Sequence, residues 1–141
     1  MNLSPNFTLK ELTATSTGIE NEPSFDERDK LLYLARYILQ PIRDEWGRIR
    51  VTSGFRSAPV NFKVGGSPSS QHLFGEAADI QPLDIDIDTV FDWIVRTLTF
   101  GQAILEQRGE DWWIHLSLPR FSPKKNNESL VFKNGVYSPY V

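Results

Sequence analysis

Two histidines and one aspartate dominate the chemistry that this sequence could perform. His72 and Asp79 lie seven positions apart within residues 70–79, and His115 follows within residues 112–117. The chain has only these two histidines and no cysteine. Catalytic zinc takes three protein ligands and keeps a fourth position open for water, and two imidazoles with one carboxylate meet this requirement. We therefore predict a hydrolytic zinc site, one ion per chain, with His72, Asp79 and His115 as ligands.

The segment that carries Asp79, residues 77–81, is short, apolar and built from small side chains. Such a segment predicts a strand in the centre of the core. A carboxylate is costly to bury there unless it is paired or bound to a metal ion. The position of Asp79 therefore supports its assignment as a ligand.

A β-hairpin is predicted to carry the second histidine. The segments 103–107 and 112–116 are apolar and rich in β-forming residues, and the short polar turn 108–111 joins them. If Gln107 faces Trp112 across the hairpin, the register of every other pair follows.

This register decides which side chains face the metal. Side chains alternate between the two faces of a strand, so Ile104, Glu106, Trp113 and His115 would share one face. Glu106 then lies diagonally across from His115 and points toward the zinc site. A shift of one residue would turn all four side chains to the other face.

The chain is expected to reach His72 through a strand at residues 48–53 and a long loop. Residues 54–70 are so rich in glycine, proline and serine that we expect no regular structure there. Long structureless loops in small domains are often functional. We therefore expect this loop to position His72.

The most helical segment of the sequence follows the capping-box pattern at residues 24–27. Pro41 should interrupt this helix near Leu39 or Gln40, because proline lacks a backbone donor. Gly47 is a natural end. The spacing of its apolar residues predicts a buried face that comprises Leu31, Leu34, Ala35, Ile38 and Ile42.

Two further elements complete the predicted fold. Asp88 is expected to cap a second helix, whose inner face would comprise Val90, Trp93, Ile94 and Leu98. The tail from residue 119 to 141 is polar and contains Asn134-Gly135, a strong hairpin signal. We assign this tail no chemistry.

Length and composition predict one small domain spanning residues 1–141, with its core at about 7–118. The net charge of −3 argues against a nucleic-acid partner. The sequence has no apolar run long enough to insert into a membrane and no recognisable signal peptide. The absence of cysteine fits synthesis in a reducing cytoplasm.

Several of these segments together resemble a known family. They include Ser53-Gly54-Phe55-Arg56-Ser57, Ser70-Gln71-His72 with Asp79, and Trp113-Ile114-His115. The pattern, which runs from about Phe7 to Ser117, resembles the zinc D-alanyl-D-alanine carboxypeptidases. That group includes phage L-alanyl-D-glutamate endopeptidases, and the hedgehog signalling domain shares its fold. The resemblance implies a small α+β domain whose central antiparallel sheet carries the zinc, with helices packed on one side.

The resemblance also implies roles for individual residues. His72, Asp79 and His115 match the zinc ligands. Arg56 matches an arginine that contacts the substrate or steadies the charged intermediate. Ser70 matches a serine that lines the substrate pocket, and Trp113 is expected to form part of the pocket wall.

The general base departs from the family pattern. Many members have a carboxylate three residues before the second histidine, but Trp112 stands there and cannot accept a proton. Glu106 is the better candidate, because it ends the preceding strand, as in the hedgehog-like branch, and the hairpin register directs it inward. Asp111 is the reserve candidate.

Two functions are compatible with these features. The first is a monomeric zinc peptidase that hydrolyses peptidoglycan stem or cross-bridge peptides, as a carboxypeptidase or an endopeptidase. Such an enzyme could serve phage or prophage lysis, acting on the cell wall after release from the cytoplasm. The alternative is a non-catalytic zinc-binding module of the same fold, used for peptide binding or assembly.

Overall fold

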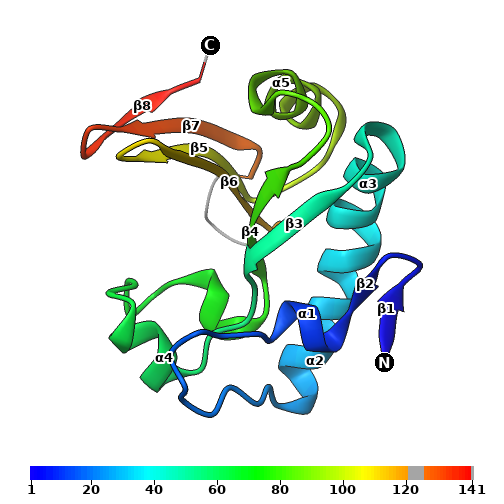
Figure 1. The fold of residues 1–141 in the computed structure, drawn as a ribbon, viewed down its shortest axis with the longest axis vertical. Coiled ribbons are helices and arrows are strands. Elements are labelled where there is room, and N and C mark those ends of the chain that lie inside the picture. The colour runs from blue at the N-terminus through cyan, green and yellow to red at the C-terminus, as the bar shows by residue number, and fades with distance from the viewer. Residues whose placement is uncertain (121–125, 141) are drawn as a thin grey trace.

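A six-stranded sheet organises the protein, seen in a computed structural model that describes residues 1–120 and 126–140 (Figure 1). In spatial order its strands are β3 (Ile49–Ser53), β4 (Ala77–Pro82), β6 (Asp111–Ser117), β5 (Gln102–Arg108), β7 (Glu128–Lys133) and β8 (Val136–Pro139). A separate two-stranded sheet joins β1 (Asn2–Ser4) to β2 (Phe7–Thr8).

The centre of the main sheet is antiparallel, as predicted. The pairs β3–β4, β4–β6 and β5–β6 all run antiparallel. The C-terminal strand β7 adds to β5 in parallel, and β8 then folds back antiparallel to β7. The whole sheet is therefore mixed, and the predicted α+β class is confirmed.

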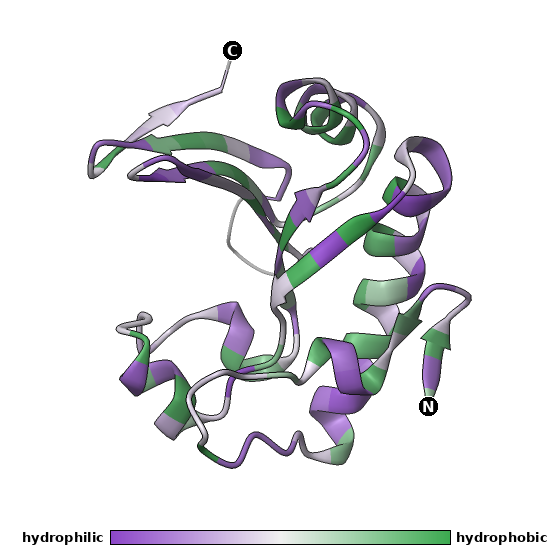
Figure 2. Ribbon diagram, in the orientation of Figure 1, coloured by the Kyte–Doolittle hydropathy of each residue, from purple (hydrophilic) through white to green (hydrophobic). Residues whose placement is uncertain are grey.

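Helices cover one face of this sheet, as predicted. They are α1 (Leu9–Leu12), α2 (Phe25–Leu34), the π-helical turn η1 (Ala35–Leu39), α3 (Gln40–Trp46) and α5 (Ile87–Thr97). Strand residues such as Ile80 and Ile114 pack with Ile38 and Ile94 of these helices in one fully buried cluster. The alternation of polar and apolar residues along β3 agrees with a strand that has one buried face (Figure 2).

The predicted interruption at Pro41 is confirmed. The chain passes from α2 into the π turn η1, where the backbone N–H of Gln40 bonds the carbonyl of Ala35, and then into α3. Pro41 lies in the first turn of α3, where its missing donor has least effect. Gly47 ends the helix with a φ of 87°, a value that glycine adopts readily.

Two local predictions are wrong. Residues 54–70 do contain regular structure, because α4 (Ala58–Lys63) forms there, with Ser57 as its N-cap and Pro59 in its first turn. The N-cap of α5 is Asp86, whose carboxylate accepts from the backbone N–H of Thr89, and Asp88 lies inside the first turn instead.

Both predicted hairpins are present. In the β5–β6 hairpin Gln107 pairs with Trp112, the register expected from the sequence. In the β7–β8 hairpin Asn134 and Gly135 have φ values of 54° and 75°, as a two-residue turn of type I′ requires. Residues 121–125 of the predicted polar tail lie outside the described residues.

In the described part of the chain, no helix combines the length and apolar character that crossing a bilayer requires.

The two aspartates at the start of α5 offer a matched test of the capping assignment. Asp86→Ala should lower the urea midpoint of unfolding more than Asp88→Ala. The first change leaves the N–H of Thr89 without its acceptor, whereas the second removes only a charge near the helix N-terminus. Circular dichroism during urea titration measures both midpoints, and equal midpoints would contradict Asp86 as the cap.

Candidate metal centre

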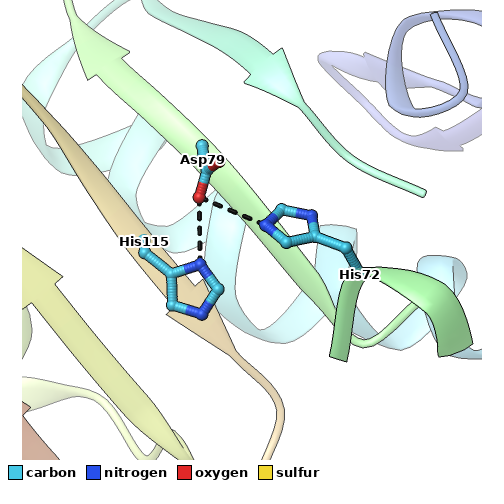
Figure 3. A group of neighbouring side chains, drawn as sticks. All are labelled: His72, Asp79 and His115. Carbon is cyan, nitrogen blue, oxygen red and sulfur yellow. Dashed lines mark hydrogen bonds and ion pairs between the residues drawn. The ribbon is translucent and has the colours of Figure 1, made fainter. Parts of the chain in front are cut away.

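The three predicted ligands lie together on the face of the sheet opposite the main helices (Figure 3). Asp79 on β4 and His115 on β6 are direct cross-strand partners, so their side chains leave the same face side by side. His72 approaches from the short 3₁₀ turn η2 (Gln71–Phe74). One ligand atom from each residue lies within 4.8 Å of the others, so the group could hold a metal ion.

Hydrogen bonds orient the buried His72. Its Nδ1 lies 2.7 Å from the carbonyl oxygen of Gly54. A carbonyl can only accept, so Nδ1 donates to it and Nε2 is the nitrogen that faces Asp79. That Nε2 lies 3.3 Å from Oδ1 of Asp79. A histidine fixed in this way by its second nitrogen is typical of metal sites in proteins.

Gly54 can hold His72 only because it has no side chain. A Cβ there would lie 2.3 Å from the carbonyl oxygen of Leu12. The neighbouring backbone is tied on both sides, since Phe55 donates to Leu12 and Arg56 donates to the carbonyl of His72. The loop after β3 therefore reaches His72 through a close backbone contact that other residues would block.

Asp79 is the most constrained group of the centre. Its Oδ1 lies 3.0 Å from Nδ1 of His115, and its Oδ2 lies 3.4 Å from the guanidinium of Arg56. Burial alone would raise the pKa of Asp79, but His72 and His115 beside it hold that pKa well below its ordinary value. The carboxyl group is thus kept ionised, as a metal ligand must be.

The spacing of these atoms suits zinc. Zinc–ligand distances of about 2.0–2.1 Å in a tetrahedral site place neighbouring ligand atoms roughly 3.3–3.4 Å apart. The two contacts of Asp79 Oδ1, at 3.3 Å and 3.0 Å, are close to this spacing. Two imidazole nitrogens and an ionised carboxylate oxygen also form a donor set that zinc prefers.

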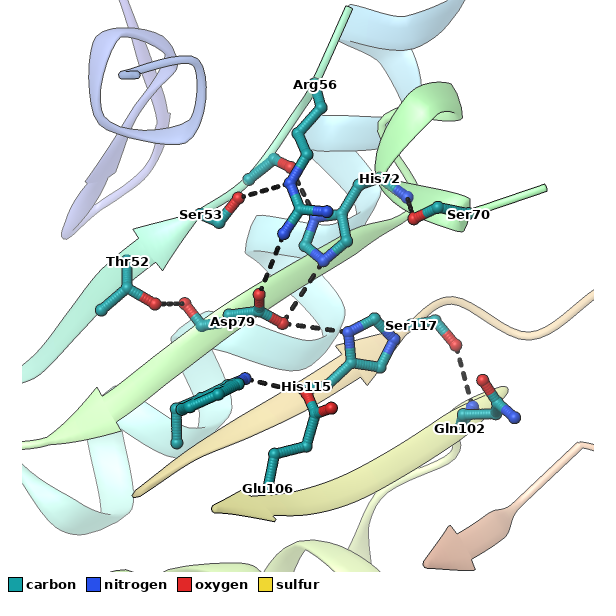
Figure 4. A network of polar contacts seen from close by, with 12 residues as sticks. Thr52, Ser53, Arg56, Ser70, His72, Asp79, Gln102, Glu106, His115 and Ser117 are labelled. Carbon is teal, nitrogen blue, oxygen red and sulfur yellow. Dashed lines mark hydrogen bonds and ion pairs between the residues drawn. The ribbon is translucent and has the colours of Figure 1, made fainter. Parts of the chain in front are cut away.

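Glu106 lies next to this group on the same face (Figure 4). It pairs with Trp113 across the β5–β6 hairpin, and the indole N–H of Trp113 donates to its Oε2 at 2.8 Å. Burial raises the pKa of Glu106, and the negative charge of Asp79 adds to this, while His115 and Trp113 oppose it. A carboxylate with a raised pKa is a better proton acceptor than an ordinary one.

A cavity of about 830 Å³ opens over the candidate centre and is lined by all three predicted ligands and Glu106.

Comparison with known proteins gives one decisive result: the sequence model of Peptidase M15 matches residues 3–117. The chain belongs to the M15 peptidase family. This family is of the zinc D-Ala-D-Ala carboxypeptidase type, so the resemblance found in the sequence is confirmed. A comparison with curated proteins finds no match.

In this M15 chain, Arg56 lines the cavity and also contacts a candidate metal ligand. Its Nε donates to Ser53 at 3.0 Å, and its two terminal nitrogens contact Asn61 and Asp79 at 3.4 Å. Three of its five N–H groups are thus engaged, and the other two have no partner among residues 1–120 and 126–140.

The remaining predicted residues divide between cavity and surface. Ser70 lines the cavity, and its hydroxyl accepts from the backbone N–H of His72 at 3.1 Å. Trp113 also lines the cavity, whereas Trp112 packs toward the core on the other face. Asp111, the reserve base, is exposed at the start of β6 and is not among the cavity-lining residues.

Sequence reasoning missed the contribution of the C-terminal hairpin to the cavity. Glu128, Phe132 and Tyr137 line it, because β7 pairs in parallel with β5 and continues the face that carries Glu106. The Asn-Gly signal predicted the hairpin, but no feature of the sequence indicates the strand with which it pairs. Arg108 also lines the cavity and was expected only as part of a turn.

Metal analysis of purified protein tests the candidate centre. Wild type should bind one equivalent of Zn²⁺, and His115→Ala should lose it, because two ligands cannot complete the site. Added zinc should also stabilise wild type by about 2.7 kcal/mol at a hundredfold excess over Kd, and should not stabilise the variant. Dialysis with elemental analysis, and thermal unfolding, provide the measurements.

Asp111→Asn is the matched control, since it removes an exposed carboxylate from the same strand. It should keep one equivalent of zinc. Stoichiometric, tight zinc binding by His115→Ala would exclude the proposed ligand set.

Proposed function

We propose that this protein is a zinc peptidase that hydrolyses the stem or cross-bridge peptides of peptidoglycan. The observation that carries the proposal is that His72, His115 and the ionised Asp79 line one open cavity together with the partly buried Glu106. Membership of the M15 family supports peptidase chemistry. The sequence resemblance to wall-degrading enzymes supports the choice of substrate.

In this proposal His72, Asp79 and His115 hold the zinc ion. The ion would supply Lewis acidity to the scissile carbonyl and to the attacking water. His72 and His115 act as neutral ligands, and Asp79 supplies one negative charge.

Glu106 takes the proton from the attacking water and passes it to the leaving amine. Glu106 lies on the face that carries His115 and lines the same cavity, which supports this role. The indole of Trp113 holds one carboxylate oxygen, which leaves the other free to accept the proton.

Arg56 has two tasks in this scheme. It fixes the outer oxygen of Asp79, so that Oδ1 stays directed at the two imidazoles. Because Arg56 also lines the cavity, its remaining N–H groups would donate to a substrate carboxylate or to the developing oxyanion. Ser70 and Trp113 would contact the bound peptide along the cavity wall.

We extend the proposal to a monomeric enzyme of wall lysis, on the basis of the sequence resemblance to phage L-alanyl-D-glutamate endopeptidases. The net charge of −3 is consistent with a partner other than nucleic acid.

Replacement of the proposed base gives the sharpest test. Glu106→Gln keeps the size of the side chain and its bond from Trp113 but cannot take a proton. It should keep one equivalent of zinc and lose about 10²- to 10⁴-fold in kcat. Release of amines from purified peptidoglycan, with mass spectrometry of the products, measures the rate.

Asp111→Asn serves again as the control and should keep near wild-type activity. The reverse pattern, with Asp111→Asn inactive and Glu106→Gln active, would make Asp111 the base. If zinc-loaded wild type releases nothing from any type of wall, the non-catalytic binding module becomes the better explanation.

Because Arg56 both holds Asp79 and faces the substrate, Arg56→Lys should lower peptidase activity but leave the zinc content unchanged. Lysine keeps the charge but cannot bind Ser53, Asp79 and a substrate group through one planar fork. The variant should lose roughly 10- to 100-fold in kcat/KM, measured with the same peptides. Its zinc content should stay at one equivalent in the presence of excess ion, and unchanged kcat/KM would remove Arg56 from the mechanism.

A further inference from the structure

The cavity continues past the candidate centre onto the C-terminal hairpin. Register places Trp113, Glu106, Phe132 and Tyr137 in one cross-strand row on β6, β5, β7 and β8. Cross-strand partners project from the same face of a sheet. The row therefore leads from Trp113, beside His115, through the proposed base to two aromatic rings.

This aromatic end is a fixed part of the sheet. Strand β7 pairs with β5 over five residue positions. Val131 and Tyr140 pack against the core, and the N–H of Tyr140 donates to Ser129 at 3.0 Å. The hairpin lies beyond residues 3–117, the part of the chain that matches the M15 family. The C-terminal hairpin is therefore an addition to the matched region, and its pairing with β5 holds it against the site.

Phe132 and Tyr137 form a wall of the cavity. Their ring centroids are 4.5 Å apart, and both side chains line the cavity. Tyr137 is 57% exposed although its ring is held against Phe132. Rigid aromatic faces with one open side bind ligand groups at little entropic cost.

One cavity-lining arginine beside this wall forms no ion pair in the described part of the chain, although Asp111 is its cross-strand partner and its charge lowers the pKa of the nearby Glu106. Three arginines line the cavity, and two of them are engaged, Arg56 with Asp79 and Arg120 with Glu76. Arg108 is exposed and forms no ion pair within residues 1–120 and 126–140. It lies two residues after Glu106 on the same face of β5.

We propose that Arg108, Phe132 and Tyr137 form a subsite for a carboxylate-bearing residue of the peptide substrate. The guanidinium binds the carboxylate through paired hydrogen bonds, and the two rings pack against the aliphatic part of the same residue. This inference rests on the proposed peptidase function and deepens it.

The distance between Glu106 and Arg108 along β5 also limits which substrate residue the subsite can bind. Two residues of a strand span about 6.6–6.8 Å, so Arg108 lies about that far from Glu106 along the strand. An extended peptide covers the same distance in about two residues. The carboxylate should therefore belong to a residue within two positions of the scissile bond.

The test uses a set of wall peptides in which each carboxylate in turn is replaced by a carboxamide. Wild type should lose roughly tenfold in kcat/KM when one particular carboxylate near the cleaved bond is neutralised. Arg108→Gln should cleave the acid and the amide equally. Lys133→Gln, which removes a cation from the other face of the sheet beside Trp112, should keep the wild-type preference.

The aromatic wall is tested by Phe132→Ala and Tyr137→Ala, with Val136→Ala as a control on the opposite face of the hairpin. The two aromatic variants should raise KM several-fold and leave kcat nearly unchanged, because the rings hold the substrate without touching the reacting atoms. The control should match wild type. Kinetics of the aromatic variants equal to those of Val136→Ala, or an acid preference retained by Arg108→Gln, would overturn the subsite.

Direct binding separates this inference from the peptidase proposal. If wild type cleaves none of the peptides, the peptidase proposal fails, and calorimetric affinities for the intact acid and amide peptides then decide the subsite. Tighter binding of the acid that is lost in Arg108→Gln supports it. Equal affinities of wild type for both peptides overturn it.

Discussion

The ionised carboxylate of Asp79, buried in a central strand, is the constraint on which the rest of the site depends. Burying an unpaired carboxylate costs several kcal/mol, so the fold must supply compensating partners. It does so from three different segments, with His72 on a turn, His115 on the neighbouring strand and Arg56 on a loop. The direct pairing of Asp79 with His115 makes the β4–β6 register part of the chemistry, since a shift of one residue would turn His115 into the core.

The segments around the sheet then have a common task, which is to bring His72 to this carboxylate. Gly54 lets the loop after β3 pack directly on the end of α1 while its carbonyl holds the imidazole. Asn61 on α4 contacts Arg56 and also donates to the carbonyl of Ser67, so it links the arginine to the chain leading into η2. Loops held by backbone contacts of this kind can be as well positioned as strands, and they make a site possible at the open face of a sheet.

The sequence was sufficient to predict that His72, Asp79 and His115 lie together, and also the β5–β6 register and the face of Glu106. These features depend on local periodicity and on the scarcity of histidine. The sequence misled at α4, where Pro59 was taken as evidence against a helix although proline is well tolerated in a first helical turn. It also misled at Asp86, since three aspartates alternate near the start of α5 and more than one could serve as a cap. The parallel pairing of β7 with β5 could not be predicted, because strand partners distant in sequence leave no periodic signal.

Two carboxylates on one face of the sheet have their pKa values moved in opposite directions, and this separation assigns them different tasks. Asp79 faces two imidazoles and a guanidinium, which favour its charge despite burial. Glu106 lies one strand beyond β6, in a row with three aromatic residues, so burial and the nearby charge of Asp79 favour its neutral form. Glu106 depends on Asp79 in this respect, because the charge that suits Asp79 to bind a metal also makes Glu106 more basic. A site of this kind needs the two carboxylates on different strands, close enough to interact and far enough apart to have different neighbours. The β4–β6–β5 order meets that condition by placing His115 on the strand between them.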